Sequence, residues 1–470
     1  MSMTEISGAG TGWRDMLSPG QRGAVLLISS GVGMHAFNDL AIAASIPVAY
    51  AALDSLPFLP LAYALFFLGV VLGGLLSAEL RARLGARRTA VTGALLFSTG
   101  VALTALAWTG WVFALGRALQ GLSDGIIVAL CYGLIPDLIR KDLVARVFSV
   151  EAIVWAVAAG LGPLAGGYAT EALGWRAAML VCLPLVLIFF VAALPVLGEA
   201  HRRADLSARR PAGLPVLLAL TGTLCFALPT ALPGRAWGAA LVLAGLALFA
   251  LALRIDGKRD KAFFPRRFFS LSVTGRGAWL NFLMPISQSA TTVFLALALT
   301  AIWGMSPIWV GWIIITLALS WSGTAMVLSN LTVRQRAGLL RFGPMLQVVG
   351  LSCVAIGLGT SVLPIVLVGQ VLSGASFGMV WGPATEVIMR ITPEADKTRV
   401  SSFLPVLQTT GFAVGAGLVG WVAGMSGLTE TLGTKVTAPI YVLWGSAAAL
   451  SCIAATLALG MRPATEELTS

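Results

Sequence analysis

Long apolar stretches separated by short polar loops run through almost the whole chain of 470 residues. Fourteen of them are 18 residues or longer, allowing a few polar interruptions. With a rise of ~1.5 Å per residue, each is long enough to cross a hydrocarbon core of ~30 Å as a helix. Isolated strands could not cross, because lipid offers no partners for their backbone groups. We therefore predict fourteen transmembrane helices, near 24–50, 58–80, 89–109, 111–136, 147–170, 175–197, 213–231, 236–253, 274–302, 306–329, 342–361, 364–389, 401–425 and 437–460.

The chain also resembles itself at a fixed offset of 253 residues. The matching positions fall in three segments. Residues 81–88 correspond to 334–341, and Gly162 and Gly167 correspond to Gly415 and Gly420. Between them, the series Gly116, Leu119, Gly121, Ser123, Gly125 corresponds to Gly369, Leu372, Gly374, Ser376, Gly378. Three segments that share one register are difficult to obtain by chance. Two homologous halves in an apolar chain are typical of secondary transporters, whose substrate site lies between the halves.

The repeat divides the predicted helices into two sets of six with an insertion between them. We expect an N-terminal six-helix bundle over residues 1–200 and a C-terminal six-helix bundle over residues 271–470. Cytoplasmic loops and a two-helix hairpin occupy residues 201–270. A pair of inserted helices preserves the orientation of the second half, which makes the long offset physically reasonable. The predicted fold class is thus an all-α polytopic membrane protein.

Composition and charge placement agree with this prediction. Apolar residues make up 58% of the chain and charged residues only 11%, which excludes a soluble globular protein. If both termini are cytoplasmic, 27 of the 31 Lys and Arg residues fall on the cytoplasmic side. This asymmetry predicts a multi-pass protein of the cell (inner) membrane with both termini inside. The net charge of +11 therefore reflects topology, and no basic surface for nucleic acid is expected.

Few residues are available for metal or redox chemistry. The five cysteines all lie inside predicted spans, and there are only two histidines, so neither a metal site nor a disulfide framework is expected. An intramembrane enzyme is therefore a poor alternative. No nucleotide-binding loop is evident, which makes an ion gradient the natural energy source and leaves no cofactor to predict.

The segment 158–167 reads Ala-Ala-Gly-Leu-Gly-Pro-Leu-Ala-Gly-Gly. It matches the antiporter motif Gly-x-x-x-Gly-Pro-x-x-Gly-Gly of the fourteen-span drug:proton antiporters of the major facilitator superfamily, except that Ala158 replaces the first glycine. The chain resembles this family over nearly all its length. The resemblance implies the major facilitator fold, with Gly162, Pro163, Gly166 and Gly167 sealing or hinging the outer half of the transporter. Ordinary helix packing through small residues is the alternative.

Span four contains Arg117-Ala-Leu-Gln120-Gly121, which matches the family's Arg-x-x-Gln-Gly motif. The resemblance implicates this motif in proton coupling. Arg117, Gln120 and Asp124 are spaced by three and four residues, so they share one helix face. Charges deep in a membrane cost ~2.5–3.5 kcal/mol and usually face a wet or paired interior. A salt bridge that only holds helices together is the alternative.

Span one contains His35, Asn38 and Asp39, followed by Pro47. Counting back from Pro47 places Asn38 at the family's acidic position and Asp39 one residue later. Asp39 and Asp124 each lie ~20 Å from the edge at which their span begins, near the midplane. We therefore predict that Asp39 and Asp124 exchange protons as a coupled pair tuned by Arg117. His35 could join a proton relay, although a polar residue hydrogen-bonded between helices is the favoured interpretation.

The predicted substrate cavity draws on both halves. Its polar candidates in the second half are mostly neutral, since Gln370 occupies the place equivalent to Arg117, and Gln288 the place equivalent to His35. The expected cavity residues are His35, Asn38, Gln120, Asn281, Gln288, Gln370 and Trp381.

The loop after span two resembles the superfamily's cytoplasmic motif Gly-x-x-x-Asp-Arg-x-Gly-Arg-Arg. Arg83, Gly85 and Arg87 match, but Ala82 stands where the aspartate belongs. Glu79, one turn earlier, could substitute as the acidic partner. With Arg88, these residues form the expected cytoplasmic gate loop, which in the superfamily latches the two halves.

Together these features predict a proton-coupled exporter of small amphipathic organic compounds that works by alternating access as a monomer. Its expected partners are a small-molecule substrate, protons and the lipid bilayer. A proton-coupled or facilitative importer of a small solute remains the alternative within transport. Substrate-driven efflux against a gradient separates the two.

Overall fold

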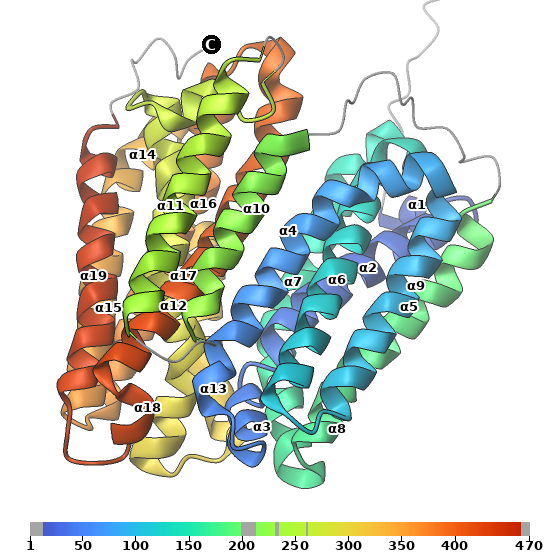
Figure 1. Ribbon diagram of the computed structural model, residues 1–470. Coiled ribbons are helices and arrows are strands. Elements are labelled where there is room, and N and C mark those ends of the chain that lie inside the picture. Colours follow the sequence, from blue (N-terminus) through green and yellow to red (C-terminus); the bar gives the residue numbers. More distant parts are fainter. Residues whose placement is uncertain (1–12, 199–212, 231–234, 260–261, 462–470) are drawn as a thin grey trace, which may run out of the picture.

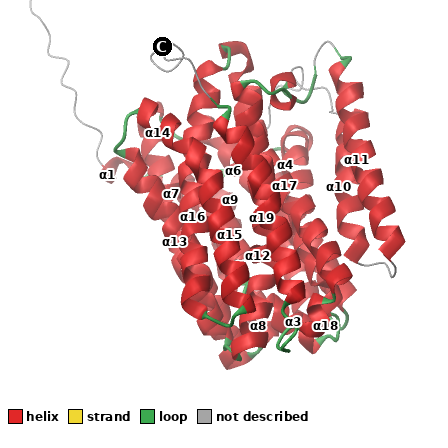
Figure 2. Cartoon of the chain, turned by 90° about the vertical axis from the view of Figure 1, so that its left-hand side faces the viewer, coloured by secondary structure: helices red, strands yellow, loops and turns green. Residues whose placement is uncertain are grey.

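The computed structural model describes residues 13–198, 213–230, 235–259 and 262–461. This part of the chain consists of helices and loops, and Figure 2 shows no strand in it. Most of the cytoplasmic loop predicted before the insertion lies outside the described residues.

Figure 1 shows two groups of helices, in blue to green and in green to red. The first contains α1 (Trp13–Met16), α2 (Arg22–Ala41), α3 (Ile46–Ala52), α4 (Leu59–Leu84), α5 (Ala86–Ala105), α6 (Gly110–Leu138), α7 (Val144–Leu173), α8 (Trp175–Met179) and α9 (Leu183–Val196). The inserted helices are α10 (Gly213–Ala227) and α11 (Arg235–Gly257). The second group contains α12 (Val273–Trp303), α13 (Pro307–Ser329), α14 (Val333–Leu339), α15 (Gly343–Gly359), α16 (Leu363–Ile391), α17 (Glu394–Ser426), α18 (Leu428–Thr431) and α19 (Ala438–Leu459).

Thirteen helical segments among the described residues are long and apolar enough to cross a membrane. The remaining predicted span, near 89–109, is the 20-residue helix α5, which packs against α6 and α9. Its first turn contains Arg87 and Arg88, and the helix carries several Thr, Ser and Gly residues, so it is less apolar than the others. The protein is therefore a multi-pass membrane protein with thirteen candidate spans.

The predicted first span, near 24–50, is not one continuous helix. It is divided into α2 and α3 by a turn over residues 42–45. Pro47 has no N–H to donate to the carbonyl of Ala43, so the helical ladder cannot continue through this point. The prediction of an uninterrupted helix was wrong here, because one proline near the end of an apolar run is a weak signal.

Helices α4 and α6 touch through their backbones. A Cβ atom added at Gly73 would lie 2.0 Å from the carbonyl oxygen of Leu122, and one at Gly121 would lie 2.0 Å from that of Phe66. Such close approach is possible only without side chains at these positions, which is the usual function of small residues between membrane helices.

The same packing recurs in the second group and explains the repeated glycines. Gly374, the equivalent of Gly121, lies against the carbonyl of Leu317 in α13, and Gly378 lies against that of Trp321. Because α13 follows α12 as α4 follows α2 and α3, the offset of 253 residues relates equivalent helix contacts in the two groups.

The two groups touch at only one end among the described residues (Figure 1). We call the end where α2 begins and α19 ends the terminal end, and the opposite end the far end. The hydrophobic cluster shared by both groups includes Phe67 stacked on Phe412 with ring centroids 5.2 Å apart. At the far end, Gly167 of α7 also lies against the carbonyl of Pro307 in α13. Toward the terminal end each group has separate clusters of its own, and the ribbons diverge.

Replacing Gly73 with alanine should destabilise the protein, because its Cβ would meet the Leu122 carbonyl. Overpacking of this kind costs ~1–3 kcal/mol, so we expect a lower thermal midpoint in detergent. The neighbouring change Gly74→Ala is the matched control, since the nearest atom to its Cβ is 4.0 Å away. Equal midpoints for the two variants would contradict the backbone contact between α4 and α6.

Candidate functional site

A histidine–aspartate pair joins α2 to α6 in the interior of the first group. His35 Nδ1 lies 2.7 Å from Asp124 Oδ2. The Asp124 side chain is 0% exposed, whereas that of His35 is 20% exposed. The indole of Trp155 in α7 stands edge-on to the imidazole, with ring centroids 5.5 Å apart. Three helices thus meet at one ionisable pair.

The direct partner of Asp124 in the structure is His35. The sequence led us to predict that Asp124 and Asp39 exchange protons as a coupled pair, and the structure places the imidazole of His35 against the carboxylate of Asp124. Asp39 is half-buried one helical turn after His35 and lies within electrostatic range of His35, Asp124 and Arg117. The second oxygen of Asp124, Oδ1, finds no hydrogen-bond partner among the described residues.

Arg117 is 1% exposed and lies on the same helix as Asp124. One of its terminal N–H groups donates to Gln120 Oε1 over 2.6 Å, and Gln120 Nε2 donates to the hydroxyl of Thr104 over 2.9 Å. The guanidinium carbon lies 3.9 Å from the centroid of the Phe66 ring, a cation–π geometry. The polar chain and the aromatic face together hold a charge in the interior at a fixed position.

The side chains of Asn38 and Asp39 have different neighbours. It is buried, and its Oδ1 accepts a hydrogen bond from the Cys182 thiol, with 3.7 Å between oxygen and sulfur. Asn38 therefore contacts the segment between α8 and α9, while Asp39 lies near Arg117 and His35. The one-residue shift inferred from Pro47 thus places the amide and the acid in different surroundings.

The second group has neutral polar residues in its interior. A cavity of about 10 Å³ brings together Asn281 of α12, Trp381 of α16 and Gln408 of α17. This volume holds about one water molecule. Gln288 and Gln370 are buried elsewhere, and each has a side-chain oxygen without a partner among the described residues.

Sequence reasoning missed Gln408, although the repeat could have indicated it. Gln408 lies 253 residues after Trp155, and Phe377, which also lines the cavity, lies 253 residues after Asp124. The cavity therefore contains the equivalents of Asp124 and Trp155, whereas Gln288, the equivalent of His35, does not line it. Sequence reasoning also missed Thr104 and Phe66, which hold Gln120 and Arg117.

The antiporter motif lies between α2 and α13. A Cβ added at Gly166 would meet the carbonyl oxygen of Ala41 at 1.7 Å, and Gly162 faces the same stretch of α2. On the other side, the carbonyl of Pro163 lies against Gly311 of α13. Close to the break in span one, the Thr170 hydroxyl donates to that of Ser45 over 2.6 Å. The motif thus connects the first span to the second group at the far end.

The predicted gate loop has its acidic partner within one helix. Arg83 Nε donates to Glu79 Oε1 at 2.5 Å, one turn apart on α4. The contact to another helix is made instead by Arg81, which binds Asp137 and the carbonyl of Gly133 in α6. Gly85, with φ of 84°, ends α4 and allows α5 to begin at once, and Arg87 and Arg88 are exposed.

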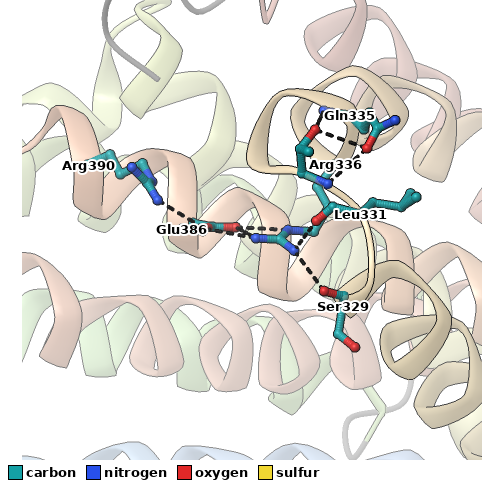
Figure 3. Close-up of polar contacts among 7 residues, drawn as sticks. Ser329, Leu331, Gln335, Arg336, Glu386 and Arg390 are labelled. Carbon is teal, nitrogen blue, oxygen red and sulfur yellow. Dashed lines mark hydrogen bonds and ion pairs between the residues drawn. The ribbon is translucent and has the colours of Figure 1, made fainter. Parts of the chain in front are cut away.

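The second group has a stronger version of this contact (Figure 3). Arg336, the equivalent of Arg83, binds both oxygens of Glu386 on α16, with Nε and Nη2 at 3.0 and 3.1 Å. The same side chain donates to the carbonyls of Ser329 and Leu331, and Arg390 lies 3.6 Å from Glu386. The contacts of Arg81 with Asp137 and of Arg336 with Glu386 therefore each lie within one group of helices and do not join the two groups.

Comparison with known proteins agrees with this geometry. Residues 28–255 match the family model of the Major Facilitator Superfamily. A probable multidrug-efflux transporter of Mycobacterium tuberculosis is 24% identical over 435 residues, covering 89% of this chain and 91% of that protein. A multidrug efflux pump of Staphylococcus aureus is 21% identical over 401 residues, covering 83% of this chain and 87% of that protein.

Solved structures share the fold at low identity. The POT family transporter PepTSo superposes with a TM-score of 0.67 at 16% identity, covering 94% of this chain and 98% of that chain. A D-xylose–proton symporter gives a TM-score of 0.65 at 15% identity, covering 94% and 98%. The all-helical architecture is therefore the major facilitator fold. The family model over residues 28–255 and the relatives agree that this chain is a secondary transporter of the major facilitator type and not an enzyme, and the solved structures share its fold.

Proposed function

We propose that this transporter is a proton-coupled exporter of small amphipathic organic compounds. The observation that carries the proposal is the buried His35–Asp124 pair, with Asp39 and Arg117 within electrostatic range. Deep ionisable residues are costly in a membrane and usually belong to an ion or proton pathway. The names of the relatives, which are multidrug-efflux transporters, support export as the direction.

The pair can change charge without leaving the interior. With a neutral imidazole and an ionised carboxylate it carries one negative charge, and binding one proton removes that charge. Because the Asp124 side chain is fully buried, this change alters how strongly α2 and α6 are held together. Arg117, fixed by Gln120 and Phe66, supplies a constant positive charge nearby. We assign proton exchange to His35, Asp39 and Asp124.

The substrate would lie between this site and the neutral residues of the second group. Asn281, Trp381 and Gln408 line one cavity that holds about one water molecule in the described state, so this cavity would have to widen before its amides and indole could bind a compound with polar and aromatic parts. The two halves differ at equivalent positions of the repeat, since the first half carries ionisable side chains where the second half carries neutral ones. We therefore place substrate recognition mainly on the second group.

The orientation follows from charge placement. We place both termini in the cytoplasm, count α5 as a fourteenth span and treat residues 1–200 and 271–470 as the two moving bundles of a monomer. The far end is then the outer face, and the described state is closed to the outside. In this arrangement Gly162, Pro163, Gly166 and Gly167 belong to the outer seal.

Replacing Asp124 with asparagine should abolish proton-driven transport and preserve exchange down a gradient, because the shape remains while the titrating group is lost. The measurement is dye efflux and proton flux in sealed proteoliposomes across a panel of amphipathic compounds. Asp54→Asn is the matched control, since Asp54 is an exposed loop residue at φ of 47°, where asparagine is equally suited. An Asp124→Asn variant with normal proton-driven efflux would overturn the assignment.

Replacing Gly167 with alanine should weaken the outer seal, because its Cβ would lie 2.6 Å from the carbonyl of Pro307. We expect several-fold slower proton-driven transport with nearly normal membrane insertion. Gly160→Ala on the same helix is the control, since no atom lies within 4 Å of its Cβ. Equal transport by the two variants would show that the contact does not limit the cycle.

Cysteine labelling tests the orientation. In a background without the five native cysteines, Ser306→Cys at the start of α13 should react with an impermeant maleimide added outside intact cells. Arg334→Cys, at the start of α14, should react only after the membrane is opened. The reverse pattern would place the termini outside and reverse the direction assigned to the closed end.

A further inference from the structure

A second buried carboxylate lies between the terminal end and the His35–Asp124 pair. Glu151 of α7 is 3% exposed, and its Oε1 accepts a hydrogen bond from the Ser29 hydroxyl of α2 over 2.9 Å. Its other oxygen, Oε2, has no hydrogen-bond partner among the described residues. One neutral hydrogen bond compensates only part of the cost of burying a carboxylate. A purely structural tie between α2 and α7 does not need an acid here.

The packing of α2 on α7 relates Glu151 to the pair. The two helices run parallel, with Ser29 beside Glu151, His35 beside Trp155, and Ala41 beside Gly166. Counted along these helices, Glu151 lies ~10 Å from the start of α7 and His35 ~20 Å from the start of α2. Glu151 therefore lies ~10 Å closer to the terminal end than His35, in the same interface between α2 and α7.

Two aromatic side chains lie near this carboxylate, Phe148 one turn before it on α7 and Tyr132 within electrostatic range on α6. Tyr132 of α6 and Phe148 of α7 stack with centroids 6.4 Å apart, and both are partly exposed. The titratable groups that face Glu151 are Tyr132 and Cys131 from α6. On α2 the facing groups are Ser29 and, about 9 Å farther along the helix, His35. Among the described residues, no ion pair includes Glu151.

We propose that Glu151 is a further proton-exchanging residue, which passes protons between the His35–Asp124 pair and the terminal end. This inference rests on the proposed proton coupling. In the described state, a proton leaves the pair, crosses the intervening ~9 Å through water and protonates the Glu151 carboxylate. Glu151 then releases one proton to water at the terminal end, so each step moves a single proton and conserves charge.

The test measures protons directly and needs no substrate. The purified full-length protein is subjected to a small pH jump in a stopped-flow instrument with a soluble pH-sensitive dye. Glu151→Gln keeps an oxygen that accepts from Ser29 but cannot titrate. We expect proton uptake to be about tenfold slower than in the unmodified protein, since removing a positioned acid–base group usually costs at least this much. The total number of protons bound should also fall.

Two control variants keep a carboxylic acid at position 151, and one of them removes the hydrogen bond from Ser29. Ser29→Ala deletes the hydroxyl that donates to Glu151, and Glu151→Asp retains a carboxylate, so both should keep fast uptake. If Glu151→Gln takes up protons at the unmodified rate, the relay is wrong. If Ser29→Ala slows uptake as much as Glu151→Gln does, the contact acts only through helix packing, which also overturns the proposal.

A third variant separates this inference from the function on which it rests. Asp124→Asn should lower the number of protons bound, whatever the role of Glu151. If Asp124→Asn leaves both the rate and the amplitude unchanged, the proposed proton site fails. If Asp124→Asn lowers the amplitude while Glu151→Gln changes nothing, only the relay fails.

Discussion

Backbone-to-backbone contact between helices is the constraint on which the other features of this structure depend. Gly121 lies against the Phe66 carbonyl, and Gly166 lies against that of Ala41, so α6 and α7 approach α4 and α2 without intervening side chains. At this separation, short polar groups reach across the interface. The serine–carboxylate bond between Ser29 and Glu151 lies in the α2–α7 interface that Gly166 tightens. Gly31 of α2 lies against the thiol of Cys131 in α6, on the two helices that the His35–Asp124 contact joins. Small residues thus bring together the helices that carry these ionisable groups.

One scaffold carries two different chemistries. The equivalent glycines Gly121 and Gly374 make equivalent contacts, so the two groups have the same helix geometry at this position. At the site, however, Asp124 is replaced by Phe377, and Trp155 by Gln408. In a membrane each unneeded charge is expensive, so confining the ionisable groups to one half limits that cost. The asymmetry is consistent with the proposed separation of proton exchange from substrate recognition.

The sequence predicted depth along the membrane well and direction around each helix poorly. Counting from the ends of the spans places Asp39 and Asp124 at similar depths, because the rise per residue is fixed. The contact of Asp124 with His35, one turn before Asp39, agrees with this count. Direction normally follows from an apolar stripe on one face, but these helices are apolar all round, and lipid and interior both accept such faces. The direct contact of Asp124 with His35 therefore depends on helix packing that the sequence does not encode locally.

The parallel packing of α2 and α7 gives the proposed proton site a mechanical connection to the far end. Glu151 lies near the start of α7, and Gly167, which touches the carbonyl of Pro307 in the second group, lies on the same continuous helix. A change in charge near His35 alters the attraction between α2 and its neighbours, and α7 is fixed to α2 by the contact of Gly166 with Ala41. Any shift of α2 that carries α7 with it must also move the contact between the two groups. The break after Ala41, where span one is no longer a continuous rod, provides a place at which α2 can tilt while α3 stays at the far end.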